Sequence, residues 1–181
     1  MSDEKNGRTY SFDVCSQCKL ICCQGANPPL TSRRRKIIAD YLQKQGASAA
    51  NVFVGGSYLH PAADAQDYCA LFNKETGKCR VHSVKPETCV AGPVTFDINL
   101  KTSKVAWFLK KGSICALAEK LCQDDKKFKA HLEAAKPQVM RLIRELDAEA
   151  LRAILKISEP ETFKVGENEL PQEVSEKLRI A

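Results

Sequence analysis

The pattern of apolar positions first predicts a helix that begins near Thr31. Its apolar residues recur at helical spacing, at Ile37, Ile38, Tyr41 and Leu42;. Thr31 or Ser32 is suited to cap the N-terminus, because a side-chain oxygen there accepts a hydrogen bond from a free backbone N–H. Gly46 is placed to end the helix, since glycine readily adopts the left-handed conformation that follows a last helical turn.

A strand pattern follows further along the chain. Apolar and polar residues alternate strictly from Val94 to Leu100, as they do when one face of a strand is buried. A second apolar run, Val105 to Leu109, returns after the polar segment 101–104. We therefore expect a β-hairpin. Residues 51–67 show no clear period and are expected to be an extended or looping connection.

Helices are expected again after Cys115. Leu117, Leu121 and Cys122 share one face of the first helix;. A second helix is expected to begin near Asp124 and to be interrupted at Pro137, because proline has no backbone N–H to donate. The apolar stripe beyond Pro137 consists of Val139, Leu142, Ile143, Leu146, Leu151, Ile154 and Leu155. From Ser158 onward the chain is polar and acidic, and we expect a tail that lies on the surface.

Together these elements predict the α+β class. We expect a small, irregular, metal-bound cysteine-rich core with helices and one β-hairpin, followed by a helical C-terminal segment. Residues 69–93 hold three cysteines among turn-forming residues, which indicates irregular backbone around ligands;. Residues 1–123 are expected to form the cysteine-cluster domain, and residues 124–181 a helical extension and polar tail packed on it. The extension contains no cysteine and is expected to be scaffold.

Cysteine is the residue type that departs from ordinary composition, with nine in 181 residues. The sequence shows no signal peptide and no apolar run of membrane-spanning length, so we expect a cytoplasmic protein with no membrane association. Disulfides are disfavoured in that reducing compartment. Closely spaced cysteines there more often bind metal.

Four of the cysteines lie close together, at Cys15, Cys18, Cys22 and Cys23. Two thiolates separated by two residues can bind one metal, and Cys22 follows Cys18 by about one helical turn on the same side. Cys22 and Cys23 point in different directions and are awkward ligands for one small ion. We therefore predict that this adjacent pair serves two centres lying side by side.

The second group is evenly spaced, with nine residues between Cys69 and Cys79 and nine between Cys79 and Cys89. None of the three belongs to a local pair, so the fold must bring each to its centre. Cys115 raises the number of predicted ligands to eight, enough for two sites of four thiolates. His82 is a possible substitute ligand, but the thiolates already suffice, and we favour a supporting or surface role for it.

The predicted cofactor is an iron-sulfur cluster, with [4Fe-4S] favoured and zinc as the alternative. Both accept four thiolates, and the preference for iron rests on eight soft ligands without the paired short spacings of a zinc ribbon. The formal net charge of +6 would suit nucleic acid. Two four-thiolate sites subtract about four charges, however. We therefore interpret the basic excess as a counterweight to the metal sites and do not expect nucleic-acid binding.

The cysteine segments resemble the YkgJ-type cysteine-cluster family, which is described as a zinc- or iron-chelating domain. The likeness covers about residues 10–118 and lies in Cys15-Ser-Gln-Cys18-Lys-Leu-Ile-Cys22-Cys23, Cys69-Ala-Leu-Phe, Gly77-Lys-Cys79-Arg-Val-His82 and Lys85-Pro86-Glu-Thr-Cys89. The resemblance implies that the family's eight cysteines fall on the eight ligands named above. Departures from the family's usual residues are His82 in place of tyrosine, Lys85-Pro86 in place of Arg-Pro, and Val90 in place of arginine.

The sequence thus predicts a metal-binding protein whose iron-sulfur or zinc centres carry electrons or support the modification of a partner protein. The protein or redox partner is not identified. One alternative is an iron-sulfur-dependent protein-lysine methyltransferase, which the resemblance to flagellin N-methylases implies. No catalytic residue can be named, so whether the chain is an enzyme stays open. Another alternative is a zinc-dependent nucleic-acid-binding module, suggested by Arg33-Arg34-Arg35-Lys36.

Two further expectations concern single features. The cations Arg33–Lys36 oppose the dipole in the first turn of their helix, so we expect them to lie near the metal sites, with a solvated basic face as the alternative. Cys122 follows Cys115 by seven residues, about 10 Å along a helix. We expect Cys122 to be the non-ligating cysteine and to pack in the core beside Leu121.

Overall fold

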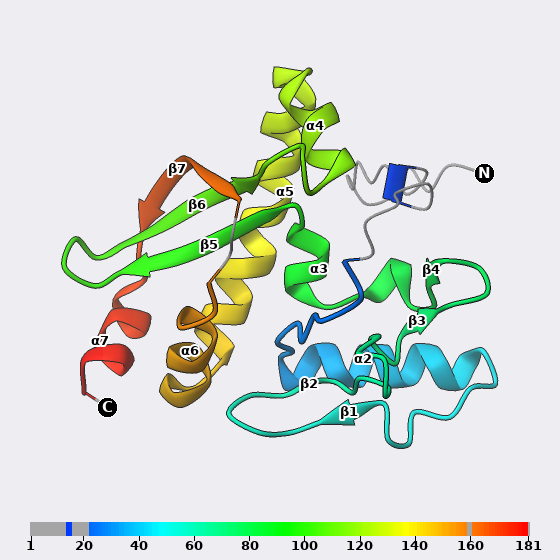
Figure 1. Ribbon diagram of the computed structural model, residues 1–181. Helices are drawn as coiled ribbons and strands as arrows, with labels where there is room; N and C mark the ends of the chain where they lie inside the picture. Colours follow the sequence, from blue (N-terminus) through cyan, green and yellow to red (C-terminus); the bar gives the residue numbers. More distant parts are fainter. Residues whose placement is uncertain (1–13, 16–21, 159–160, 181) are drawn as a thin grey trace.

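The chain folds into helices and small antiparallel sheets (Figure 1), and the expected α+β class is confirmed. The computed structural model describes residues 14–15, 22–158 and 161–180. Its elements in chain order are α2 (Ser32–Lys44), β1 (Phe53–Val54), β2 (His60–Pro61), β3 (Phe72–Asn73), β4 (Lys78–Cys79), the 3-10 helix η1 (His82–Val84), α3 (Glu87–Ala91), β5 (Val94–Asn99), β6 (Lys104–Lys110), α4 (Ala116–Cys122), α5 (Asp125–Glu145), α6 (Ala148–Leu155), β7 (Thr162–Glu169) and α7 (Gln172–Ile180). One predicted metal ligand, Cys18, lies outside the described residues.

The sheet in the larger hydrophobic core has the strand order β5-β6-β7, and its neighbouring strands are antiparallel. All six residues of β5 pair with β6, so the predicted hairpin is confirmed. Along β6 every second residue is buried, at Val105, Trp107 and Leu109. The two-residue period of a strand turns these side chains to one face, where they pack with apolar residues of α5, α6 and α7.

The expectation of a polar surface tail beyond Ser158 is wrong. The segment supplies a third strand, β7, and a further helix, α7. The apolar pattern did not predict β7, because β7 is an edge strand with mostly exposed side chains. It is held by its backbone pairing with β6;. The sequence did contain a helical pattern that could have predicted α7. Leu170, just before this helix, and Val174 and Leu178 within it recur every four residues and are buried;.

The predicted interruption at Pro137 is wrong as well, because α5 continues through this residue. Pro137 is exposed, as is Glu133, whose carbonyl loses its backbone donor and can bond to water instead;. The buried side of α5, which includes Leu132 and Val139, passes the proline without a break. Packing in the core therefore outweighs the local cost. None of the described helices combines the length and apolar character needed to cross a bilayer.

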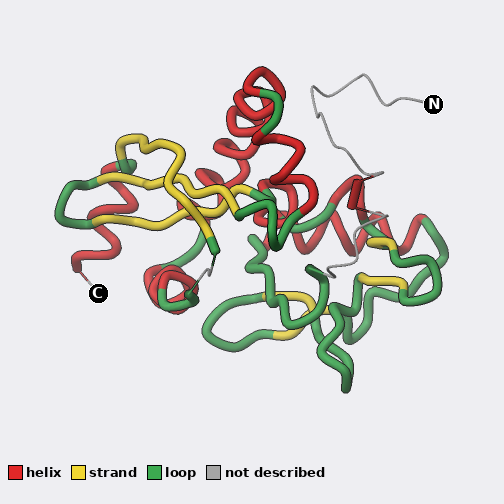
Figure 2. The backbone as a smooth tube through the Cα atoms, turned by 45° about the horizontal axis from the view of Figure 1, so that its top comes forward, coloured by secondary structure: helices red, strands yellow, loops and turns green. Residues whose placement is uncertain are grey.

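A second hydrophobic core lies against α2 and is built largely from loops and two-residue strands (Figure 2). Ile38 and Leu42 of α2 meet Leu71 and Val81 there, and all four are almost completely buried. The irregular backbone expected for this part of the chain is confirmed. The domain boundary expected after residue 123 stays a prediction, and the larger core contains residues from both sides of it.

Helix caps follow the sequence closely. The Thr31 side chain accepts a hydrogen bond from the Arg34 N–H at 3.0 Å, and Gly46 follows α2 with a φ of +70°;. Asp124 caps α5, which begins where expected. At the other end of α5, the Lys177 ammonium of α7 donates to the carbonyls of Ile143, Arg144 and Leu146. These bonds tie α7 to the end of α5.

A buried polar network joins the two cores. Glu87 at the start of α3 accepts a hydrogen bond from the Thr31 hydroxyl at 2.8 Å and pairs with Arg34 of α2, with 3.5 Å between Arg34 Nε and Glu87 Oε1. Arg34 also donates to Gln138 of α5 at 2.8 Å. Exposure is only 5% for Arg34 and 1% for Glu87. Each charge therefore depends on the other for the interactions that water would otherwise supply.

Replacing Arg34 with methionine should lower the free energy of unfolding by about 3–5 kcal/mol, because it leaves the Glu87 carboxylate buried without its counter-ion. Urea denaturation of the full chain measures the change. The matched control is Arg33→Met, at an exposed position of the same helix, which should change stability by less than about 0.5 kcal/mol. Equal losses in the two variants would show that the pair does not join the cores.

Replacing Leu178 with alanine should cost about 2–5 kcal/mol, because α7 would leave a cavity in the larger core;. Urea denaturation is again the measurement. Glu176→Ala removes an exposed side chain of the same helix and should be close to neutral;. A neutral Leu178→Ala variant would mean that the C-terminal segment is the dispensable surface tail that the sequence suggested.

Candidate metal centre

Four cysteines from distant parts of the chain meet beside the smaller core. The Cys69 N–H donates to the Cys23 carbonyl at 2.8 Å, which fixes those two residues side by side. Cys79 lies on strand β4 and pairs with Phe72 of strand β3. Phe72 follows Cys69 by three residues, so the hairpin brings Cys79 close to Cys69. Cys89 lies in α3, the helix held by the Arg34–Glu87 network. The fold thus brings these four predicted ligands together from separate segments of the chain.

The four thiols share a desolvated environment in which their charges act on one another. Burial raises the pKa of Cys23 to about 12, and the thiolate charges of Cys79 and Cys69 add to the effect. The pKa of Cys89 is raised first by burial and further by Cys79, Cys23 and Cys69. Burial also raises the pKa values of Cys69 and Cys79. Without bound metal, these thiols are therefore protonated at neutral pH.

Two backbone N–H groups point at sulfur atoms of this group. The N–H of Leu71 bonds to the Cys69 thiol, and the N–H of Val81 bonds to the Cys79 thiol. Each bond lowers the pKa of its thiol, against the larger effect of burial. The same local geometry occurs twice, two residues after each cysteine, because the apolar Leu71 and Val81 side chains are anchored in the smaller core. Such donors stabilise thiolates, the form that binds metal.

Lys85 supplies the full positive charge that acts on the group. Its ammonium lowers the pKa values of Cys23, Cys79 and Cys89, against the stronger effect of burial. The cations Arg33–Lys36, which we expected near the metal sites, differ among themselves in position. Arg34 reaches α3 through Glu87, two residues from Cys89, while the other three cations are exposed.

The four thiols are suitable ligands for a thiophilic metal, but their sulfur atoms do not converge on a single metal position. Within residues 14–15, 22–158 and 161–180, no three Cys, His, Asp or Glu side chains converge tightly enough to hold a metal ion. Neutral thiols have no strong attraction for one another, and a metal cation supplies it by binding their deprotonated forms. Four soft ligands with backbone donors to sulfur suit zinc or an iron-sulfur cluster, whereas calcium and magnesium prefer oxygen.

His82 is the first residue of η1 and follows Cys79 by three residues in the chain. Burial lowers the pKa of His82 to about 4, with a further contribution from Lys85, so its imidazole is neutral at pH 7. A neutral imidazole is competent to bind metal. The residue is half-buried rather than on the surface, and its assignment as a ligand or a supporting residue stays a prediction.

Two of the remaining predicted ligands, Cys15 and Cys115, lie on segments that meet at α4. Val14 packs with Leu117 and Leu121 of α4, and the partly buried Cys115 borders this small cluster. The neighbour of Val14 in the chain, Cys15, is therefore on the segment that approaches Cys115. Cys15 and Cys22 are exposed, and Cys18 lies outside the described residues. Cys22 acts electrostatically on its neighbour in the chain, Cys23.

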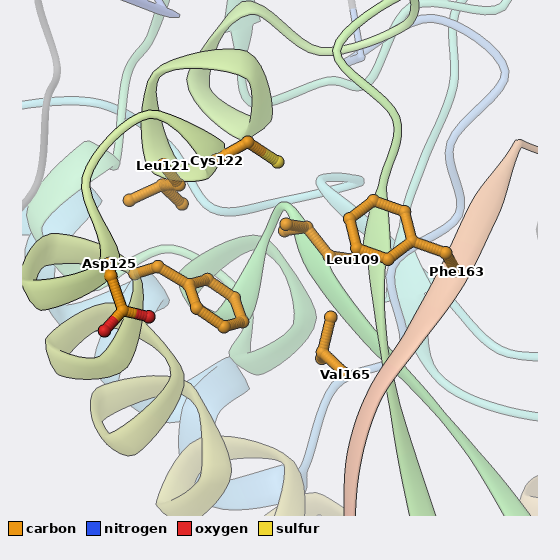
Figure 3. A pocket seen from close by; sticks show the side chains of 7 residues that line it. Leu109, Leu121, Cys122, Asp125, Phe163 and Val165 are labelled. Atoms are coloured by element: carbon orange, nitrogen blue, oxygen red, sulfur yellow. The ribbon is translucent and has the colours of Figure 1, made fainter.

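The expectation that Cys122 packs in the core is wrong. Leu121 is buried, but Cys122 is exposed at the rim of an apolar groove of about 220 Å³ between α4, α5 and the sheet (Figure 3). Phe163 and Val165 of β7 line the opposite side of this groove. Cys122 is the last residue of α4, and the buried side of this helix consists of Leu117, Ala118 and Leu121. None of the seven predicted ligands among the described residues lines the groove.

Sequence reasoning missed the groups that surround the thiols. The repeated pattern of a cysteine followed two residues later by a large apolar residue, in Cys69–Leu71 and Cys79–Val81, could have indicated the N–H donors. The position of Lys85 between two ligands was visible, but its proximity to Cys23 required the fold. No pattern in the chain could have paired Arg34 with Glu87.

Comparison with models of protein families matches residues 14–123 to the family CxxCxxCC, described as "Putative zinc- or iron-chelating domain". The matched segment is more than half of the chain and includes all eight predicted ligands. This chain has three residues between Cys18 and Cys22, where the family label has two. Comparisons with curated proteins and with solved structures gave no match. The chain belongs to the CxxCxxCC family of zinc- or iron-chelating domains.

Proposed function

We propose that the protein holds a zinc ion or an iron-sulfur cluster on Cys23, Cys69, Cys79 and Cys89. The observation that carries the proposal is the mutual proximity of these four thiols, delivered by separate segments of the fold. Burying four thiols side by side has no advantage for packing alone, because ordinary apolar side chains would fill the space as well. Bound metal gives their deprotonated forms a counter-ion.

The remaining predicted ligands, Cys15, Cys18, Cys22 and Cys115, form a second centre in this proposal. Support comes from the packing of Val14 on α4, which brings the N-terminal segment toward Cys115. The adjacent cysteines then divide between centres, with Cys22 in the second and Cys23 in the first. This division agrees with their side chains, of which Cys22 is exposed and Cys23 is half-buried among the other thiols.

The identity of the metal determines what the protein does. We favour iron-sulfur clusters, with [4Fe-4S] as the expected form, because eight thiolates are available in two neighbouring groups. Loaded in this way, the protein would carry electrons or support modification of a partner protein. Zinc at the same thiolates would have a structural role, since four protein ligands leave no open position for catalysis.

The two alternative functions receive less support. Arg34 of the basic run is buried and paired, and Arg35 lies over the Phe53 ring, 5.8 Å from its centroid. Both interactions give the cations a role within the fold and weaken the argument for a nucleic-acid-binding surface. The lysine methyltransferase alternative rests on family resemblance, because no described residue has been assigned a catalytic role.

Cys79→Ser should remove the metal of the first centre, because serine is a poor ligand for soft metals. The measurement is iron, zinc and sulfide content per chain after anaerobic purification, together with the visible spectrum. Iron-sulfur clusters absorb in the visible range and zinc does not, so one preparation identifies the metal. Cys122→Ser, at the exposed cysteine outside both groups, should retain the full content. Unsubstituted protein without iron or zinc would contradict the proposed function.

Cys115→Ser tests the second centre. We expect it to lower metal content by one centre while the first centre remains, because its thiol borders the Val14 cluster rather than Cys69 and Cys79. Combining Cys115→Ser with Cys79→Ser should remove both. If either single substitution removes all metal from a chain that is still folded, the cysteines share one centre and the division proposed above is incorrect.

A further inference from the structure

We propose that the outer edge of β7 is an interface between two copies of this chain. In this dimer, residues 162–169 of the two copies pair antiparallel about a two-fold axis that passes between Val165 and Gly166. The interface would be isologous, since each copy offers the same surface to the other. The inference is independent of the metal centre, because it rests on the pairing, the faces and the charges of one strand.

β7 forms one margin of the larger sheet (Figure 1). Among residues 14–15, 22–158 and 161–180, β6 is the strand that pairs with it, along one of its two edges. The outer edge of such a strand presents a row of backbone N–H and C=O groups, which is a template for pairing with a further strand. With eight residues, β7 is long enough for a strand from a second molecule to continue the ladder;.

A β-bulge in β7 determines which face each of its residues occupies. Trp107 of β6 pairs with Gly166, whereas the next residue, Phe108, pairs with Lys164, so Val165 is the extra residue;. The alternation of faces is therefore shifted by one residue beyond the bulge. Phe163, Gly166 and Asn168 share the face of Val105, Trp107 and Leu109, and Thr162, Lys164, Glu167 and Glu169 share the opposite face.

The bulge permits two copies of β7 to pair over their whole length. Directly opposite residues of an antiparallel ladder point to the same face. In a regular strand of eight residues, pairing the first residue with the last would set residues of opposite faces against each other;. With the bulge at Val165, Thr162 is opposite Glu169 and Phe163 is opposite Asn168, and the members of each pair share a face. A second copy can therefore extend the sheet without a slip in register.

The charges in this register are complementary. Lys164 of each copy is opposite Glu167 of the other, and the two-fold axis forms this pair twice. Within one chain, Lys164 Nζ donates to Glu167 Oε2 at 2.6 Å, and Lys104 donates to the other carboxylate oxygen. The Lys164 side chain is 51% exposed and that of Glu167 is 36% exposed, so both are open to charges from a second copy. Charges on an edge strand usually deter pairing, whereas here they favour an arrangement in which opposite signs meet.

The other face of β7 supports the same contact. Phe163 is apolar, yet 42% of it is exposed. With Val165 it lines one side of the groove between the sheet, α4 and α5 (Figure 3). In the proposed dimer, Phe163 would lie opposite Asn168 of the second copy, and the added strand would cover part of its ring. This removes apolar surface from water.

The first measurement is analytical ultracentrifugation of the reduced full chain over a range of concentrations. We expect a reversible dimer with a dissociation constant of roughly 10–500 μM, because one strand from each copy makes a small interface. Amide hydrogen exchange within residues 162–169 should slow as the concentration rises, since the new ladder protects backbone N–H groups.

Two charge reversals test the register. Lys164→Glu sets two carboxylates against each other across the axis, and Glu167→Lys sets two ammonium groups against each other. Each should weaken dimerisation about 10- to 100-fold, because two attractive pairs become repulsive. An equimolar mixture of the two variant chains should recover dimers, since every Lys then faces a Glu. Mixing cannot repair the bonds that each variant has lost within its own chain, so recovery reports on the interface alone.

Lys101→Glu is the matched control, because it makes the same charge reversal at an exposed residue beyond the end of β5. It should leave the dissociation constant unchanged. Circular dichroism and urea denaturation establish that the compared chains are folded.

The proposal is overturned if the unsubstituted chain is still a monomer at about 1 mM, well above the expected dissociation constant. The outer edge of β7 would then be left to a strand of a different protein. A dimer that both charge reversals leave intact, or that the mixture does not recover, would show that the two copies meet through another surface.

Discussion

The ion pair between Arg34 and Glu87 is the interaction on which the arrangement of the two hydrophobic cores depends. Removing two charges from water costs several kcal/mol for each, and their attraction offsets this only with good geometry and further hydrogen bonds. Thr31 and Gln138 supply those bonds from two other segments. The ion pair and its hydrogen bonds to Thr31 and Gln138 can form together only when α2, α3 and α5 occupy their native positions. It therefore specifies the relative placement of the cores as well as stabilising them.

This placement matters for the metal centre because α3 is held from both sides. Glu87 at its start is bound from α2, and the carbonyl of Ala91 at its end lies 3.1 Å from His131 Nε2 of α5. Cys89 lies between these two anchors. One predicted ligand, Cys89, is thus fixed by the network that joins the cores, while Cys69 and Cys79 are fixed by apolar residues of the smaller core. Metal binding would add a further link among segments that have little regular secondary structure of their own.

The family match and the hydrophobic cores do not end at the same residues. Residues 14–123 match the family, yet the core around Trp107 is completed by α5, α6 and α7, and β7 covers the outer edge of β6. The segment after residue 123 therefore stabilises the sheet that follows α3 and supplies His131 and Gln138, which contact α3 and Arg34. Its contribution to the proposed centre would be indirect, through the position of α3.

The sequence by itself determined the features that depend on local spacing. Thr31 and Gly46 mark the ends of α2, the alternation from Val94 predicts the hairpin, and the cysteine spacings identify the family. These signals are local because hydrogen bonds at a helix end, or the two-residue period of a strand, involve residues close together in the chain.

Only the tertiary structure decided how distant segments combine. Core packing carries α5 through Pro137, and pairing with β6 makes a strand of the polar segment 162–169. Which cysteines meet follows from contacts between separate segments of the chain. Such contacts depend on the summed burial of both cores and on the Arg34–Glu87 pair. Their energy is spread over many residues, so no short stretch of sequence contains it.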